Sequence, residues 1–351
     1  METRKIQQVG GGTYTVSLPK EWATAADIEP GAVVALHSHI DGTLVVQTGI
    51  EERNGEPLSL SVADTEPASL EPMLRAAYAA GIDSLELDAP DGVTDETHRR
   101  VDRLTRALTG VTVTDSSDDA IQVRSLLDVE EVSITQSVRQ LQFAALSAHR
   151  EATAALTAAS AAPAGGDDGT DRIAAMVDHY FQRGLDSLSV MDSLGLTRPE
   201  LFDRWVTARE LARVADHADR MASVADRLDD PVDPDFAADV DDLADRSRDL
   251  VEDAVSVVLD AGDGGTGSAA PDDADVATAR RCLDERDDLC AVLDDFDRRL
   301  FEADGADYRL THAVDALRGT TEAAGAVAEV GLQSLLRERC SPGSVDVGQT
   351  L

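Results

Sequence analysis

The strongest constraint on the fold is a repeated pattern of long amphipathic helices in the second half of the chain. Between residues 128 and 340, a long helical segment, a linker, a second helical segment, a short turn and a third helical segment occur twice. The two linkers, residues 161–170 and 261–271, are rich in Ala, Gly and Asp. The pattern repeats after about 105 residues. Because each helix must bury its apolar stripe against others, it predicts two three-helix bundles in tandem.

The helix with the clearest limits begins at Thr197. Thr197 and Glu200 form a capping box, and Pro199 stands in the first turn, where a helix tolerates proline. Apolar side chains then recur every three or four residues, at Leu211, Val214, Ala218, Met221, Ala225 and Leu228. The opposite face carries Asp216 and four arginines, Arg209, Arg213, Arg220 and Arg227. One face therefore points to neighbouring helices and the other to solvent.

The segment from Leu211 to His217 (LARVADH) resembles the signature helix of the PhoU family of phosphate-uptake regulators. That family carries two acidic residues separated by three others, and Asp216 fits the second position while Ala212 occupies the first. Glu322 corresponds to Asp216 in the second repeat. Two further segments resemble the second helices of the family, 177–181 (VDHYF) and 284–288 (DERDD).

The PhoU resemblance implies surface metal ions on these helices. Carboxylates four residues apart share a helix face and can bind one hard cation. The resemblance to the PhoU family therefore implies that Asp216 and Glu322 are ligands of a divalent metal ion. No other cofactor is expected. The residues favour ion pairs instead, because each repeat keeps one acid and a guanidinium repels a cation. The planar guanidinium of arginine can form two parallel hydrogen bonds to a carboxylate, so a row of arginines favours an acidic partner. The expected partner-binding residues are Arg209, Arg213, Arg220 and Arg227. Two ion pairs are expected around Asp216, with Arg213 and with Arg220, and one is expected between Arg318 and Glu322. The side chain of His217 is expected at the surface.

Residues 2–49 predict short strands joined by turns. The expected strands are 5–9, 13–18, 33–37 and 44–47, with a helical turn at 19–25 and a hairpin about Asp41 and Gly42. Such a segment is too small to bury a core alone. Pairing with a second copy would solve that problem.

The segment from Gly11 to Trp22 (GGTYTVSLPKEW), followed by IEPG, resembles the AbrB/SpoVT swapped-hairpin DNA-binding fold. Members of that family are intertwined dimers that contact DNA through basic residues. The resemblance implies Arg4, Lys5 and Lys20 as the DNA contacts. The first twenty residues contain these three basic residues and a single acidic residue, Glu2. The two lysines of the three are the only lysines in the chain. The alternative is that the domain serves only for dimerisation.

Residues 56–125 predict a small α/β segment with the order β-α-β-α-β-β. The first strand lacks the glycine-rich turn of a nucleotide-binding unit. A spacer and a module that senses a small ligand both fit, and the residues do not choose between them. No serine, histidine and aspartate set has the context of a hydrolase, so the sequence predicts no enzyme.

The chain is strongly acidic, with 68 acidic residues against 31 basic ones and a net charge of −37. Long periodic apolar segments argue against disorder. The composition resembles that of halophilic archaeal proteins, with a solvated acidic surface suited to molar salt. No apolar run is long enough for a membrane span, and no signal peptide is recognised. The three cysteines have no metal-binding spacing, and a reducing cytoplasm is expected.

The expected fold is multidomain and mainly α. The expected domains are an AbrB-like domain (1–49), a small α/β domain (50–125), two PhoU-like repeats (126–230 and 231–340) and a disordered tail (341–351). Together the resemblances imply a cytoplasmic homodimer that binds DNA and negatively regulates phosphate transport or its genes. Its expected partner is the ATPase of a phosphate ABC transporter or a phosphate-sensing protein. Two alternatives remain open: a transcription factor whose helices are only a scaffold, and an adaptor of the transporter that does not bind DNA.

Overall fold

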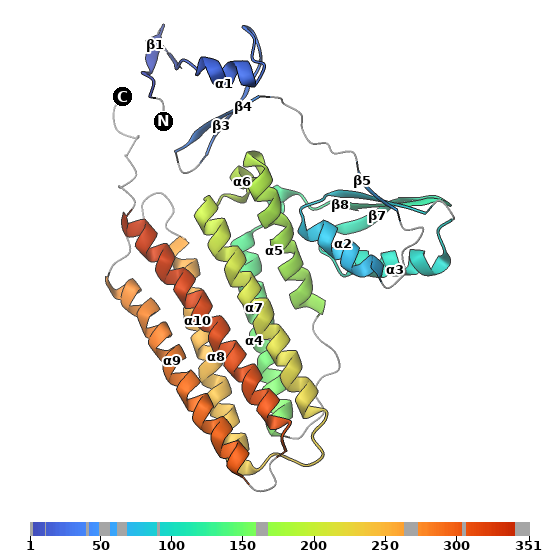
Figure 1. The fold of residues 1–351 in the computed structure, drawn as a ribbon, viewed down its shortest axis with the longest axis vertical. Helices are drawn as coiled ribbons and strands as arrows, with labels where there is room; N and C mark the ends of the chain where they lie inside the picture. Colours follow the sequence, from blue (N-terminus) through green and yellow to red (C-terminus); the bar gives the residue numbers. More distant parts are fainter. Residues whose placement is uncertain are drawn as a thin grey trace. The chain divides into compact units, whose positions relative to one another are not determined.

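The chain forms two units, Met1–Glu56 and Pro57–Leu351, and each is described by itself. The computed structural model describes residues 3–10, 12–39, 42–48, 57–61, 69–89, 92–158, 168–262, 273–303 and 307–340 (Figure 1). The expected disordered tail, most of both linkers, Glu2 and Asp41 lie outside these residues. None of the described helices is long and apolar enough to cross a membrane.

The first unit consists of two small hairpins and one short helix. Strand β1 (Gln7–Val9) pairs antiparallel with β2 (Thr13–Thr15), and β3 (Ala35–Ser38) pairs antiparallel with β4 (Leu44–Gln47). Helix α1 (Lys20–Ala25) follows Pro19, which suits a helix start. Gly10 takes the positive φ of +66° that the first turn needs. The expected elements are present, and the first two strands are shorter than expected.

The second unit begins with a layer of one sheet and two helices. Its elements are β5 (Leu58–Ser61), α2 (Leu70–Ala79), β6 (Ser84–Asp88), α3 (Asp95–Arg106), β7 (Val111–Ser116) and β8 (Ala120–Ser125). The sheet order is β5-β6-β8-β7, with β5 and β6 parallel and the other pairs antiparallel. Apolar residues of alternating strand positions, among them Leu85, Leu87 and Ile121, pack against Leu74 of α2 and Val101 of α3. The β-α-β-α-β-β prediction is therefore confirmed.

Long helices make up the rest of the unit. They are α4 (Ile134–Thr157), α5 (Asp168–Asp186), the short α6 (Leu188–Leu194), α7 (Arg198–Ala225), α8 (Pro234–Gly262), α9 (Asp273–Glu302) and α10 (Leu310–Cys340). Helix α7 packs along α4 and α10, and α8 packs along α10 and α4 (Figure 1). Both large apolar clusters contain residues from both repeats. The multidomain, mainly α fold is thus confirmed, and the two sets of three helices share their core.

Two helix limits differ from the prediction. Asp128 and Glu131 have the spacing of a capping box and predict a helix start there, but the Asp128 carboxylate accepts from Glu130 N and starts a 3-10 turn, η2 (Val129–Glu131). Helix α4 begins after Ser133, whose hydroxyl accepts from Gln136 N at 3.2 Å. The apolar pattern over 171–194 predicts a single helix, but the helix is broken at Ser187, which is extended and caps α6. In both places a local side-chain cap competes with helix continuation.

A glycine allows α7 and α10 to approach closely. A Cβ atom on Gly319 of α10 would lie 2.3 Å from Nε2 of His217, so no larger residue fits without displacing the ring. The prediction that His217 lies at the surface is wrong, because the ring is half-buried between the two helices. Burial lowers the pKa of His217, and the Arg220 guanidinium adds to the effect.

Candidate functional site

The first unit leaves its apolar side chains uncovered. Among the described residues of 1–56, no apolar side chain is buried, and Tyr14, Val33 and Leu36 are 69%, 77% and 62% exposed. Burial of such side chains contributes about 1.5–3 kcal/mol each, so their exposure in one chain is unfavourable. A second copy of the domain would cover them, as two small hairpins cannot form a core alone.

The predicted DNA contacts lie on the surface of this unit. Arg4 and Lys5 precede β1, and Lys20 is the first residue of α1, with all three side chains exposed. Lys5 and Lys20 form no ion pair with any residue that the structure describes. Both ammonium groups are exposed and unneutralised by the described residues, so no buried structural role explains them.

A comparison with protein families bears on the same segment. Residues 7–53 match the family described as antidote-toxin recognition MazE, bacterial antitoxin. The match supports the AbrB-like character of the N-terminal domain, which is consistent with dimerisation or DNA binding. It includes Lys20, whereas Arg4 and Lys5 precede it. No curated protein and no solved structure matches the chain. The PhoU resemblance of the helices stays a prediction.

The arginines of α7 lie on its solvent-facing side, as the helical periodicity predicts. Arg209, Arg213 and Arg220 of α7 are exposed, as is Asp216 among them, and Arg227 is exposed just beyond the end of the helix. Arg209 lies 3.5 Å from Asp178 of α5. Its guanidinium carbon lies 5.4 Å from the ring centre of Trp205, a cation–π distance.

An aromatic cluster adjoins this arginine row and was missed by the sequence reasoning. Trp205 stacks on Phe181 of α5 with ring centres 4.3 Å apart, and its indole N–H donates to Asp178 at 2.7 Å. Phe202 lies 6.0 Å from Trp205 and is 44% exposed. In a chain with only 3% aromatic residues, two of them three positions apart on one helix were the available signal. Aromatic and arginine side chains together are typical of protein interfaces.

The expected ion pairs within each signature helix do not form. Arg213 pairs with Glu210 at 3.2 Å, and Arg318 pairs with Asp294 of α9, so neither neutralises Asp216 or Glu322. Among the described residues, no three His, Cys, Asp or Glu side chains gather as a metal site would require. A metal ion held by Asp216 or Glu322 stays a prediction of the family resemblance.

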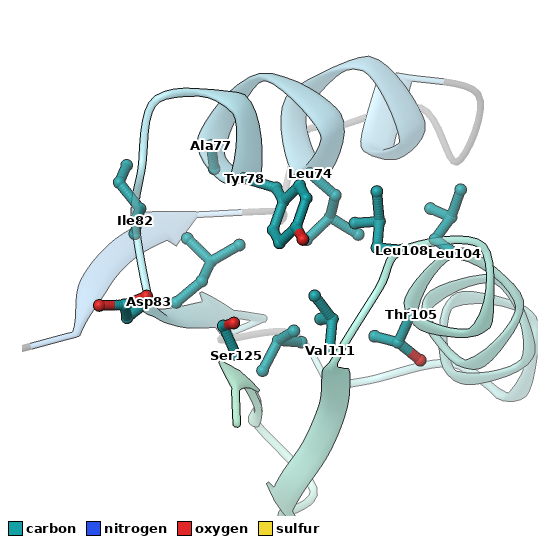
Figure 2. Close-up of a pocket in the computed structure, with 12 residues that line it drawn as sticks. Leu74, Ala77, Tyr78, Ile82, Asp83, Leu104, Thr105, Leu108, Val111 and Ser125 are labelled. Carbon is teal, nitrogen blue, oxygen red and sulfur yellow. The ribbon is translucent and has the colours of Figure 1, made fainter. Parts of the chain in front are cut away.

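A pocket lies in the α/β layer between α2, α3 and the sheet (Figure 2). Its walls are apolar except at Tyr78, Asp83, Thr105 and Ser125. The Tyr78 hydroxyl donates to Thr109 O at 2.9 Å, and the buried hydroxyl of Ser125 has no partner among the described residues. Burial raises the pKa of Tyr78 well above its ordinary range.

The same layer is attached to the long helices at this end of the pocket. The Tyr78 ring stacks on His179 of α5 with centres 4.4 Å apart, and His179 Nδ1 donates to Tyr78 O at 2.7 Å. Asp83 forms an ion pair with Arg183 at 3.2 Å. Tyr78 and Asp83 thus belong both to the pocket wall and to the contact with α5.

Proposed function

We propose that the protein is a homodimeric, DNA-binding regulator of phosphate uptake that lowers phosphate transport or the expression of its genes. The observation that carries the DNA-binding part is the N-terminal domain. It matches the MazE family over residues 7–53, it leaves its apolar side chains for a second copy, and it holds both lysines of a chain with net charge −37. Such a chain repels phosphate wherever it is not locally basic.

The phosphate part of the proposal is supported by the helices. Two sets of three long helices follow one another, and the segments at Leu211–His217 and Val177–Phe181 resemble PhoU sequences. In this proposal the helices receive phosphate status by protein contact, and the N-terminal dimer conveys it to DNA. The protein then acts in the cytoplasm, where both partners are present.

We expect Lys5→Ala and Lys20→Ala each to weaken specific DNA binding without unfolding the protein. The ionic part of binding falls steeply with salt, so in concentrated salt specificity must rest on base-edge contacts, each worth about 1–3 kcal/mol. The measurement is fluorescence anisotropy with duplexes that the wild-type protein selects from a random pool. Arg280→Ala, at an exposed position of α9, is the control and should bind as the wild type does. Unchanged affinity in both lysine variants would exclude the N-terminal domain as the reader.

The second partner is proposed to contact the exposed row of α7. Its first arginine, Arg209, lies over the Trp205 ring, and Phe202 adjoins that ring, which offers an acidic partner both charge and an apolar anchor. We expect Arg213→Glu with Arg220→Glu to abolish capture of the purified ATPase of the phosphate transporter. The same change should remove the response of DNA occupancy to phosphate. If capture and response both survive with the fold intact, the row is only a solvated surface.

One observation favours the adaptor as a second candidate. The exposed apolar residues of the N-terminal unit require a partner whether or not DNA is bound. The adaptor captures the ATPase but selects no duplex from the pool. The DNA-binding regulator does both, and a scaffolded transcription factor selects duplexes without capturing the ATPase.

A further inference from the structure

Helix α3 contains the most basic stretch of this acidic chain. Residues 97–106 hold four arginines against one aspartate, a net charge of +3 where the whole chain has −37. The four are Arg99, Arg100, Arg103 and Arg106. The first twenty residues, with three cations and one acid, hold the proposed DNA contacts. The stretch in α3 is a stronger local exception to the prevailing charge, and those contacts do not use it.

The fold presents three of these arginines on one face. Helix α3 begins at Thr94, whose hydroxyl accepts from Thr97 N at 3.1 Å. Val101 and Leu104 are buried against the sheet, which places positions 99, 103 and 106 on the opposite side. Arg99, Arg103 and Arg106 are exposed, and Arg100 is half-buried beside them. At 1.5 Å per residue, this arginine face is about 10 Å long.

The arginine face forms no close ion pair with the residues that the structure describes. None of the four arginines lies within 4.0 Å of a carboxylate of any described residue, whereas Arg209 and Arg75 both form ion pairs. Arg99 Nε donates only to the backbone oxygen of Asp95, at 3.0 Å. The acids Asp95 and Glu96 stand in the first turn, where they suit the positive end of the helix dipole. The charge of the face is therefore available to an external anion.

Helix α3 lies apart from the contact between the α/β layer and the long helices. Helix α3 packs on β7 and α2, and α2 is the helix that contacts α5. Figure 1 shows α3 at the end of the α/β layer away from the long helices. The arginine face therefore belongs to the helix of the layer that does not make its contact with α5.

We propose that the arginine face of α3 is a second contact with the phosphate backbone of DNA. Guanidinium forks bind phosphate in bidentate fashion. One strand presents a phosphate every 3.4 Å of axis, so a face about 10 Å long spans about three of them. The inference rests on the proposed DNA-binding function, because the N-terminal domain would bring a duplex to this chain. An acidic protein segment is the rival occupant, and the experiment distinguishes it.

The test measures the salt dependence of DNA affinity in the full-length protein. The variant carries Arg99→Gln, Arg103→Gln and Arg106→Gln together, and glutamine has a helix propensity close to that of arginine. Each phosphate contact adds about 0.9 to the slope of log K against log salt, so the slope should fall by about 2 to 3. The probe is a duplex pool selected by the wild-type protein. The KCl range is the one over which circular dichroism shows the fold intact.

A control triple variant makes the same change in net charge elsewhere. Arg150 of α4, Arg172 of α5 and Arg280 of α9 are exposed and have no carboxylate of a described residue within 4.0 Å. Their simultaneous replacement by Gln should leave the slope unchanged. An equal fall in the control would mean that total charge matters and the α3 face does not, which overturns the inference.

The remaining outcomes separate this inference from the proposed function. A wild-type protein that selects no duplex at all overturns both. Selection by the wild type, with the same slope in the α3 variant, overturns the α3 contact alone. If the α3 variant binds DNA as the wild type does but loses capture of the purified transporter ATPase, the face serves an acidic protein, and the DNA contact is again overturned.

Discussion

Lowering the KCl concentration from about 3 M to about 0.1 M is expected to unfold the helices cooperatively, because the screening length rises from below about 3 Å to about 10 Å. With a net charge of −37, repulsion between surface carboxylates then opposes the compact state. The melting temperature followed by the helical circular dichroism signal should fall by tens of degrees over this range.

The ion pairs of the structure do not offset this repulsion. Many lie on the surface, such as Arg298 with Asp295, whose side chains are 65% and 70% exposed. Exposed pairs contribute about 0–1 kcal/mol each. Sucrose, which favours compact states by exclusion without screening charge, is the control and should restore less stability than salt. A melting temperature that stays flat across the salt range would refute the adaptation to concentrated salt.

Much of the fold could be predicted because its elements have clear periods. The apolar stripe and the capping box at Thr197 place α7 within a few residues of its observed limits. The strands of the α/β layer follow from alternation bounded by turns. The misplaced limits at Asp128 and Ser187 are local: both side chains can cap either a short turn or a long helix, and the choice depends on what the next turn packs against.

The candidate site was harder to predict, because it depends on which helices are neighbours. Periodicity identifies the exposed face of α7, but it does not show that Asp178 of α5 contacts Trp205. It also does not show that Arg318 chooses Asp294 over Glu322, which is four residues away on its own helix. The arginines of α3 are visible in the sequence, yet acids four residues away, such as Asp95 before Arg99, predict pairing.

Removing Arg337 is expected to destabilise the helical unit by about 2–3 kcal/mol at neutral pH. Its guanidinium in α10 donates to the carboxylate of Asp203 in α7, and Asp203 is only 2% exposed. Breaking a buried pair leaves an uncompensated charge and costs about 3–5 kcal/mol. The Arg337 side chain is 41% exposed, so water can reach this pair from one side. The expected loss is therefore about 2–3 kcal/mol, below the range for a fully buried pair. Urea unfolding of Arg337→Met at constant high salt measures the loss.

The loss should depend on pH in a definite direction. Burial raises the pKa of Asp203, and Arg337 and the Ser334 hydroxyl oppose that rise. Without Arg337 the folded-state pKa rises further above the unfolded one, so folding favours the protonated acid. The stability of the variant is then greatest below the unfolded pKa of about 3.9 and declines as pH rises through the folded pKa. Relative to the wild type, the deficit of Arg337→Met should shrink from pH 7 toward about pH 4.

A second substitution isolates the carboxylate as the cause. Asp203→Asn removes the buried charge at every pH while keeping nearly the same shape, so adding it to Arg337→Met should recover most of the lost stability. It should also reduce the pH dependence of the remaining deficit, because the buried Asp203 carboxylate no longer titrates and only the neighbouring Glu338, whose pKa is raised chiefly by burial, keeps a shifted pKa there. If the double variant is no more stable than Arg337→Met, the cost lies in lost packing of the arginine stem, and the ion pair between α7 and α10 is not what stabilises their contact.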